Sequence, residues 1–249
     1  MSPPLSPPVS APVSVSPSAS VLDGAGFFGK VTSHGDFVAR RLPPAFQDGW
    51  DRWLQACIAA SKQQLGPAWL QHYLTSPIWR FALDRGVLDE HAWAGVLMPS
   101  VDRVGRHFPL MIAAPVAAGA AMLDWVDWQG GWYDALEDLA RGSLENGFVL
   151  DDFDAALAAI MPLAGEPGSV ANADHVRGGW CLPLQGADMA TLSARVAGAL
   201  LQGHSMWWSD GSPSIEASLL VCRGMPEADG FAAMLDGSWR QYGWRLPVA

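Results

Sequence analysis

The chain has 249 residues, of which 50% are hydrophobic and 16% charged, and its formal net charge is −10. A net negative charge argues against non-specific nucleic-acid binding, because such binding depends on clustered Lys and Arg. Three cysteines without a CxxC pair argue against a disulfide framework and against a four-cysteine zinc site. Beyond residue 22, no uncharged stretch reaches the roughly 20 residues that cross a bilayer.

Residues 1–24 are predicted to form a disordered, Ser/Pro-rich tail. The first 22 residues carry no charged side chain and contain six prolines, so they have neither the basic start of a signal peptide nor the composition of a packed core. The length of the remaining residues, 25–249, corresponds to one large domain or two small ones. A chain of this length buries enough surface to fold without a disulfide.

Apolar periodicity predicts the elements of the first half of the chain. A short strand at 27–31 is followed by a polar turn at 32–35. A long helix begins at Pro43-Pro44 and ends before Gly66. The later elements of this half are the short helix at 69–74 and strands at 78–83, 92–98 and 110–114.

In the second half, helices and short strands are predicted to alternate. The helices are 120–127, 131–144, 151–161, 188–201 and 226–235, and the strands are 180–184, 205–209 and 215–222. Strands therefore come singly or in hairpins between groups of helices, which favours a mixed or antiparallel sheet covered by helices. The predicted fold class is an α/β (α+β) sandwich with a central, mostly antiparallel sheet flanked by helices.

The charge is placed unevenly. Residues 1–115 carry nine Lys/Arg against eight Asp/Glu, a net of +1, whereas residues 116–249 carry six Arg against 17 Asp/Glu, a net of −11. Seven of these carboxylates lie between Asp134 and Asp154, with one basic residue, Arg141, among them. This segment is interpreted either as a solvated helical face or as an anionic surface for a basic partner.

Two sequence patterns resemble enzyme sites. Residues 24–30 have the glycine and lysine spacing of a phosphate-binding loop, but Val31 occupies the position of its magnesium-binding hydroxyl. His34, Asp36, Asp102 and His107 are four residues of metal-ligating type in two polar loops, and they would suit a divalent ion if the loops lie side by side. A small metal-dependent hydrolase is therefore kept as the alternative to a protein without enzymatic activity. The simpler interpretation of these four residues is a hydrogen-bonded loop pair without metal.

Four motifs follow one another in the first half of the chain. They are Gly26-Phe-Phe-Gly-Lys-Val-Thr-Ser-His-Gly-Asp-Phe-Val38, Trp50-Asp-Arg-Trp-Leu54, Ser76-Pro-Ile-Trp-Arg-Phe-Ala-Leu83 and Gly95-Val-Leu-Met-Pro-Ser-Val-Asp-Arg-Val-Gly-Arg-His-Phe-Pro-Leu110. Together they resemble the TagF family, also called ImpM, of bacterial type VI secretion-associated proteins. Ser205-Met-Trp-Trp-Ser209 also resembles the family, whereas Thr32 and His107 occupy positions where proline and an aromatic such as Tyr are expected.

The resemblance implies a cytoplasmic, non-enzymatic protein that holds the secretion apparatus off after translation. It also implies a single α/β sandwich domain over residues 25–249, matched most densely over residues 25–115. No cofactor is expected, and the implied partner is a forkhead-associated (Fha) scaffold protein of the type VI secretion system. Neither nucleic acid nor direct membrane insertion is expected. The resemblance does not assign an active site, so the two polar loops have to be interpreted from their own residues.

Those loops carry the candidate site, which is predicted either to bind the partner or to pin the loops together; its residues are Lys30, Ser33, His34, Asp36, Asp102, Arg103, Arg106 and His107. In the loop-pinning interpretation, Asp36 or Asp102 pairs with Arg103 or Arg106. In the partner-binding interpretation, Lys30, Arg103 and Arg106 form a cationic notch for a carboxylate or a phosphothreonine, a geometry that suits arginine. Gly26, Gly29 and Gly35 are predicted to allow close approach of another backbone.

Overall fold

The computed structural model describes residues 24–116, 130–160, 193, 196 and 200–246. Several predicted elements lie outside the described residues. They are residues 1–23 of the predicted tail, the predicted helix 120–127, the predicted strand 180–184 and most of the predicted helix 188–201. In the part of the chain that is described, no helix is both long and apolar enough to cross a membrane.

Seven strands form one antiparallel sheet, in the order β2-β1-β5-β4-β3-β6-β7. Their bounds are β1 Gly26–Gly29, β2 Val38–Arg40, β3 Trp79–Leu83, β4 Ala92–Met98, β5 Leu110–Val116, β6 His204–Ser209 and β7 Ser218–Arg223. The helices are α1 Pro44–Leu65, α2 Trp69–Thr75, α4 Gly130–Gly142, α5 Leu150–Ala159 and α7 Ala233–Asp236, with 3-10 turns at Gly66–Ala68 and Ala228–Gly230.

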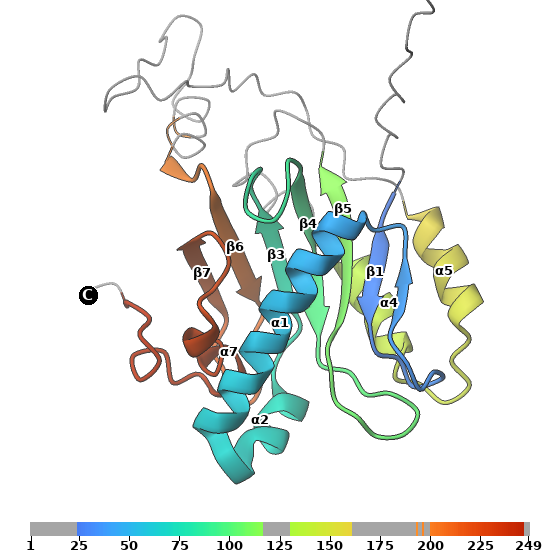
Figure 1. Cartoon of the computed structure of the whole chain (residues 1–249), viewed down its shortest axis with the longest axis horizontal. Helices are drawn as coiled ribbons and strands as arrows, with labels where there is room; N and C mark the ends of the chain where they lie inside the picture. The colour runs from blue at the N-terminus through green and yellow to red at the C-terminus, as the bar shows by residue number, and fades with distance from the viewer. Residues whose placement is uncertain (1–23, 117–129, 161–192, 194–195, 197–199, 247–249) are drawn as a thin grey trace, which may run out of the picture.

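The sheet lies between two layers of helices. Helix α1 runs across the face of the sheet that is nearer the viewer, with α2 at its lower end, and α4 and α5 cover the opposite face (Figure 1). Because side chains alternate along a strand, Phe81 packs under α1 whereas Ala82 packs under α4. The predicted sandwich with a mostly antiparallel central sheet is confirmed.

An aromatic cluster fixes α1 on its face of the sheet. The rings of Trp50, Phe81 and Trp207 are fully buried, and the centroid of Trp50 lies 4.9 Å from that of Phe81 and 6.0 Å from that of Trp207. Each belongs to a different element, so burial of these large rings joins the helix to both β3 and β6.

Two predicted elements differ from the structure. The predicted helix 226–235 is a 3-10 turn followed by the single turn of α7, because the indole of Trp244 donates a hydrogen bond to the Gly230 carbonyl oxygen (2.8 Å) that a continuous helix would use. The strand predicted at 215–222 begins only at Ser218, since Ile215 bridges back to Ser212 in a turn. The short edge strand β2 is not among the predicted elements.

Candidate functional site

The two polar loops lie side by side. The loop 30–37 joins β1 to β2, the loop 99–109 joins β4 to β5, and β1 pairs with β5, so both loops leave the sheet at its lower end (Figure 1). A Cβ atom at Gly29, where φ is +148°, would lie 2.3 Å from the Pro109 carbonyl oxygen. The prediction of close backbone approach is confirmed at Gly26 and Gly29 and is wrong at Gly35, where a Cβ atom would meet only an Arg103 guanidinium nitrogen, at 3.8 Å.

A buried ion pair joins the loops. The Lys30 ammonium donates to Asp102 Oδ2 at 2.7 Å, and the two residues are only 6% and 3% exposed. Asp102 also accepts hydrogen bonds from the Arg106 side chain and from the backbone N–H groups of Val104 and Arg106. Burial acts to raise the pKa of Asp102, but these bonds, that of Lys30 foremost, outweigh it and hold the pKa well below the usual aspartate value.

The two arginines of the second loop are placed differently. Arg106 Nε donates to Asp102 Oδ2 at 2.7 Å. A terminal nitrogen of the Arg106 guanidinium donates to the Gly35 carbonyl oxygen, and the same nitrogen lies 3.8 Å from Asp36 Oδ1. Arg103 bonds across the loops only through its backbone N–H, which donates to the His34 carbonyl oxygen at 3.0 Å. Its exposed guanidinium forms no ion pair with the described residues.

The structure therefore pairs the loops through Asp102 and Arg106, and it adds Lys30, which sequence reasoning had placed in a cationic notch. A notch of Lys30, Arg103 and Arg106 is not formed, because the Lys30 ammonium is buried and neutralised by Asp102. Sequence reasoning also missed Phe37. The Lys30 ammonium lies 4.5 Å from the centroid of the Phe37 ring, which shields it from water on that side.

The four proposed metal ligands do not converge. His34 is exposed and shares a hydrogen bond with Ser33 (Oγ to Nδ1, 2.8 Å), whereas His107 packs against the Tyr73 ring at 5.7 Å. Both oxygens of Asp102 already accept hydrogen bonds, two of them from cationic side chains that would repel a divalent ion. No group of three His, Cys, Asp or Glu side chains among residues 24–116, 130–160 and 200–246 could hold a metal ion.

A second buried charge lies on the other face of the sheet. Arg80, in β3, donates to Glu137 (2.6 Å) and Asp134 (2.7 Å) of α4, and Glu137 also binds Arg141. Part of the acidic segment 134–154 thus neutralises basic groups within the protein. Sequence reasoning missed Arg80 because its strand was interpreted only as an apolar run, although a charge in a buried strand requires a partner.

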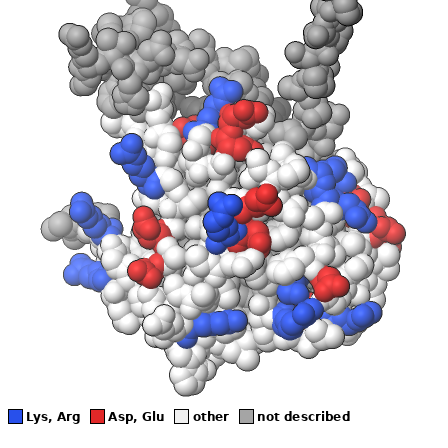
Figure 2. All heavy atoms as spheres, viewed as in Figure 1, with Lys and Arg blue, Asp and Glu red and all other residues white. Residues whose placement is uncertain are grey.

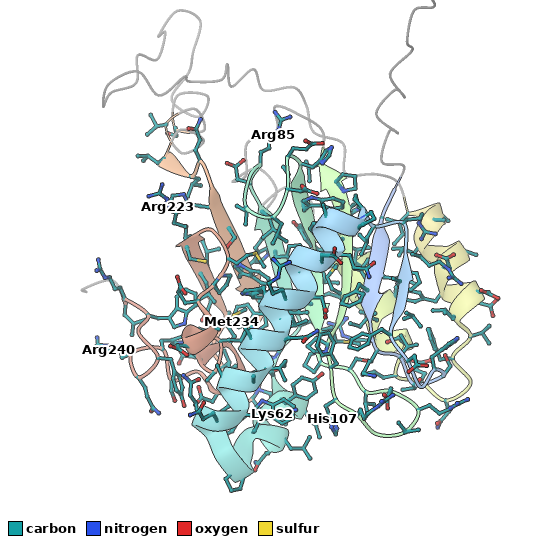
Figure 3. All side chains as sticks on the ribbon, in the orientation of Figure 1. Lys62, Arg85, His107, Arg223, Met234 and Arg240 are labelled. Carbon is teal, nitrogen blue, oxygen red and sulfur yellow. The ribbon has the colours of Figure 1, made fainter. Side chains whose placement is uncertain are left out.

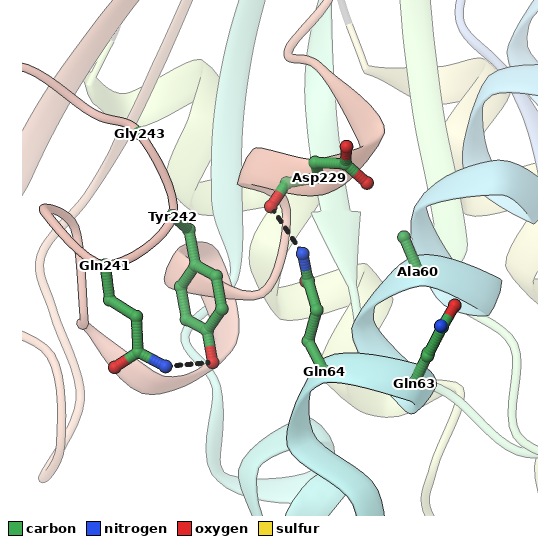
Figure 4. A pocket seen from close by; sticks show the side chains of 7 residues that line it. All are labelled: Ala60, Gln63, Gln64, Asp229, Gln241, Tyr242 and Gly243. Atoms are coloured by element: carbon green, nitrogen blue, oxygen red, sulfur yellow. Dashed lines mark hydrogen bonds between the residues drawn. The ribbon is translucent and has the colours of Figure 1, made fainter.

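A surface hollow of about 570 Å³ lies at the C-terminal end of α1 (Figure 4). Its polar side chains are occupied with near neighbours: Gln64 donates to the Asp229 carbonyl oxygen at 2.9 Å, and Gln241 donates to the Tyr242 hydroxyl at 3.1 Å. None of the candidate residues lines it. The hollow therefore contributes no group to the loop pair.

The depressed pKa of Asp102 predicts acid sensitivity. A carboxylate whose pKa is lower in the folded state stabilises the fold above its unfolded pKa of about 3.9, and this contribution is lost as the pH falls toward the folded value. In urea unfolding at several pH values, we expect the midpoint to fall steeply below about pH 4 in the wild type. The fall should be shallower in Asp102→Asn. The control Asp36→Asn changes a fully exposed carboxylate and should keep the steep fall; equal slopes in all three proteins would contradict the assignment.

The fold of this chain occurs in a solved structure of another protein. The structure of PA0076 from Pseudomonas aeruginosa PAO1 is similar to this chain, with a TM-score of 0.79 and 36% sequence identity over 90% of this chain and 98% of that one. The shared class is thus an antiparallel sheet between helices. Comparison with curated proteins gives no match.

Residues 26–160 match the TagF N-terminal domain, described as type VI secretion system-associated. The matched segment contains strands β1 to β5, helices α1, α2, α4 and α5, and both loops of the candidate site. The chain belongs to the TagF family, and the protein is associated with type VI secretion.

Proposed function

We propose that the protein is a post-translational negative regulator of type VI secretion that acts in the cytoplasm by binding the forkhead-associated scaffold protein of the system. The match to the TagF N-terminal domain over residues 26–160 carries this proposal. The protein acts by occupying the scaffold and catalyses no reaction. The geometry of the loop pair supports a binding role, because Lys30, Asp102 and Arg106 are engaged with one another and hold the loops in place.

Deletion of the gene tests the regulatory part of the proposal. In a strain with an active system, we expect secretion of the tube protein to rise several-fold while its cellular level stays unchanged, because repression is relieved after translation. Quantitative immunoblotting of culture supernatant and cells measures both. Complementation with the wild-type gene should restore repression, and unchanged secretion in the deletion strain would contradict the proposal.

A pull-down from the native bacterium tests the partner. The tagged chain is expected to retain the forkhead-associated scaffold, and a chain that lacks residues 1–24 tests whether the predicted tail contributes. Absence of the scaffold and of every other secretion component from the retained proteins would overturn the partner assignment.

A further inference from the structure

Two large apolar side chains of the loop pair remain exposed. Phe37 is 46% exposed and Val104 is 65% exposed, although both lie beside a buried ion pair. Large apolar groups that remain in water are characteristic of protein contact sites when polar groups surround them. The same two loops carry the exposed polar side chains of His34, Arg103 and Arg106.

These side chains are held in place before any partner arrives. The Phe37 ring lies parallel to that of Phe28 at 5.3 Å and meets the edge of Phe108 at 4.8 Å. The Val104 N–H is bound by Asp102 Oδ1 at 2.9 Å. Binding would thus order few side chains, and rigid aromatic and arginine groups are those that dominate interface energies.

The charge at this end is opposite to that of the whole chain. Basic side chains predominate over acidic ones along the lower edge of the molecule, where the loops and α2 lie (Figure 2). Within the two loops, Arg103 and Arg106 are exposed and are accompanied by one exposed carboxylate, Asp36, whereas the whole chain has a net charge of −10. The loops therefore attract an acidic partner although the net charge of the whole chain is negative.

We propose that Phe37, Arg103, Val104 and Arg106 form the surface that docks the scaffold, and that the scaffold meets it with an acidic patch containing apolar groups. This inference rests on the proposed function, from which the identity of the partner is taken. The Arg103 guanidinium supplies the unpaired positive charge, and Phe37 and Val104 supply the apolar contact.

Charge reversal at Arg103 tests the surface with purified scaffold and full-length protein. We expect Arg103→Glu to weaken binding about tenfold or more, because a like charge then faces the acidic patch, and Val104→Ala to weaken it about threefold. The matched control is Arg85→Glu, the same change at an exposed arginine at the opposite end of the molecule from His107 (Figure 3). It should bind as the wild type does. Circular dichroism and the thermal midpoint verify that each variant is folded.

The outcomes separate the two proposals. Wild-type binding that Arg103→Glu weakens tenfold and Val104→Ala weakens threefold, while Arg85→Glu leaves it unchanged, supports both. Wild-type binding that Arg103→Glu and Val104→Ala leave unchanged overturns the docking surface and leaves the proposed function intact. Failure of the wild-type protein to bind the scaffold overturns both. A photo-reactive phenylalanine analogue in place of Val104 gives a second measurement, since it should cross-link to the scaffold, whereas the same analogue at the exposed Leu219 of β7 should not.

Discussion

Gly29→Ala is expected to destabilise the fold by about 4 kcal/mol or more, which is the exceptional range for a single substitution. The added methyl group would meet the Pro109 carbonyl oxygen at 2.3 Å and the Leu110 Cα at 2.7 Å, and both atoms belong to the backbone of the adjoining segment. Neither can move without breaking the pairing of β1 with β5. Since Lys30 follows directly, the variant should also displace the ammonium of the loop pair. Urea unfolding followed by tryptophan fluorescence measures the loss.

The matched control for this variant is Gly86→Ala. Gly86 also has a positive φ, +79°, but no atom lies within 4 Å of a Cβ built there. It should therefore show the backbone strain alone, which is about 1 to 2 kcal/mol. If Gly29→Ala loses no more stability than Gly86→Ala, the close approach of the two backbones is not what requires glycine.

Glu137→Gln is expected to lower the free energy of unfolding by about 2 to 3 kcal/mol, because it leaves the buried Arg80 guanidinium with an incomplete set of partners. Burial acts to lower the pKa of Arg80. The neighbouring carboxylates outweigh that effect and raise the pKa, and Glu137 contributes most through its hydrogen bond and its charge. The loss should stay below that of a fully isolated buried charge, since Asp134 remains 2.7 Å away. Urea unfolding of purified protein provides the measurement.

Asp138→Asn is the matched control, because Asp138 binds the same Arg141 (3.0 Å) but is mostly exposed. It should change stability by less than about 0.5 kcal/mol. Replacing both partners, Arg80→Met with Glu137→Leu, should recover stability relative to Glu137→Gln, since no buried charge then remains unpaired and the carboxylate of Asp134, which loses its partner, is mostly exposed. A double variant less stable than Glu137→Gln would show that the pair contributes more than mutual neutralisation.

The larger elements could be predicted because their apolar periods are long. Helix α1 was predicted between Pro43-Pro44 and Gly66 and runs Pro44–Leu65, and strand β4 was predicted with its observed bounds. Strand β2 has three residues, which is too short for an alternating pattern to be distinguished from a loop. Its position follows from pairing with β1, and such pairing is set by tertiary contacts.

The candidate site was predicted in its membership more than in its contacts. The residue types indicated that charged groups of the two loops would meet. They did not indicate which groups would pair, because Lys30 and Asp102 lie 72 positions apart. Their pairing depends on the register of β1 against β5, which no local pattern specifies. Phe37 was missed for the same reason, since its exposure depends on Phe28 and Phe108 already filling the space beneath it.

The strand order has a consequence for how the chain is made. Strands β1 to β5 come from one continuous stretch, but the outer neighbour of β3 is β6, and Leu83 pairs with Ser205. At about 5 to 20 residues per second, synthesis reaches β6 roughly 6 to 24 s after β3. During that interval β3 is an open sheet edge, and such edges recruit strands of other chains. A fragment ending at residue 160, the limit of the family match, leaves β3 as an open edge permanently, so a chain that retains β6 is the smallest unit in which β3 is paired on both sides.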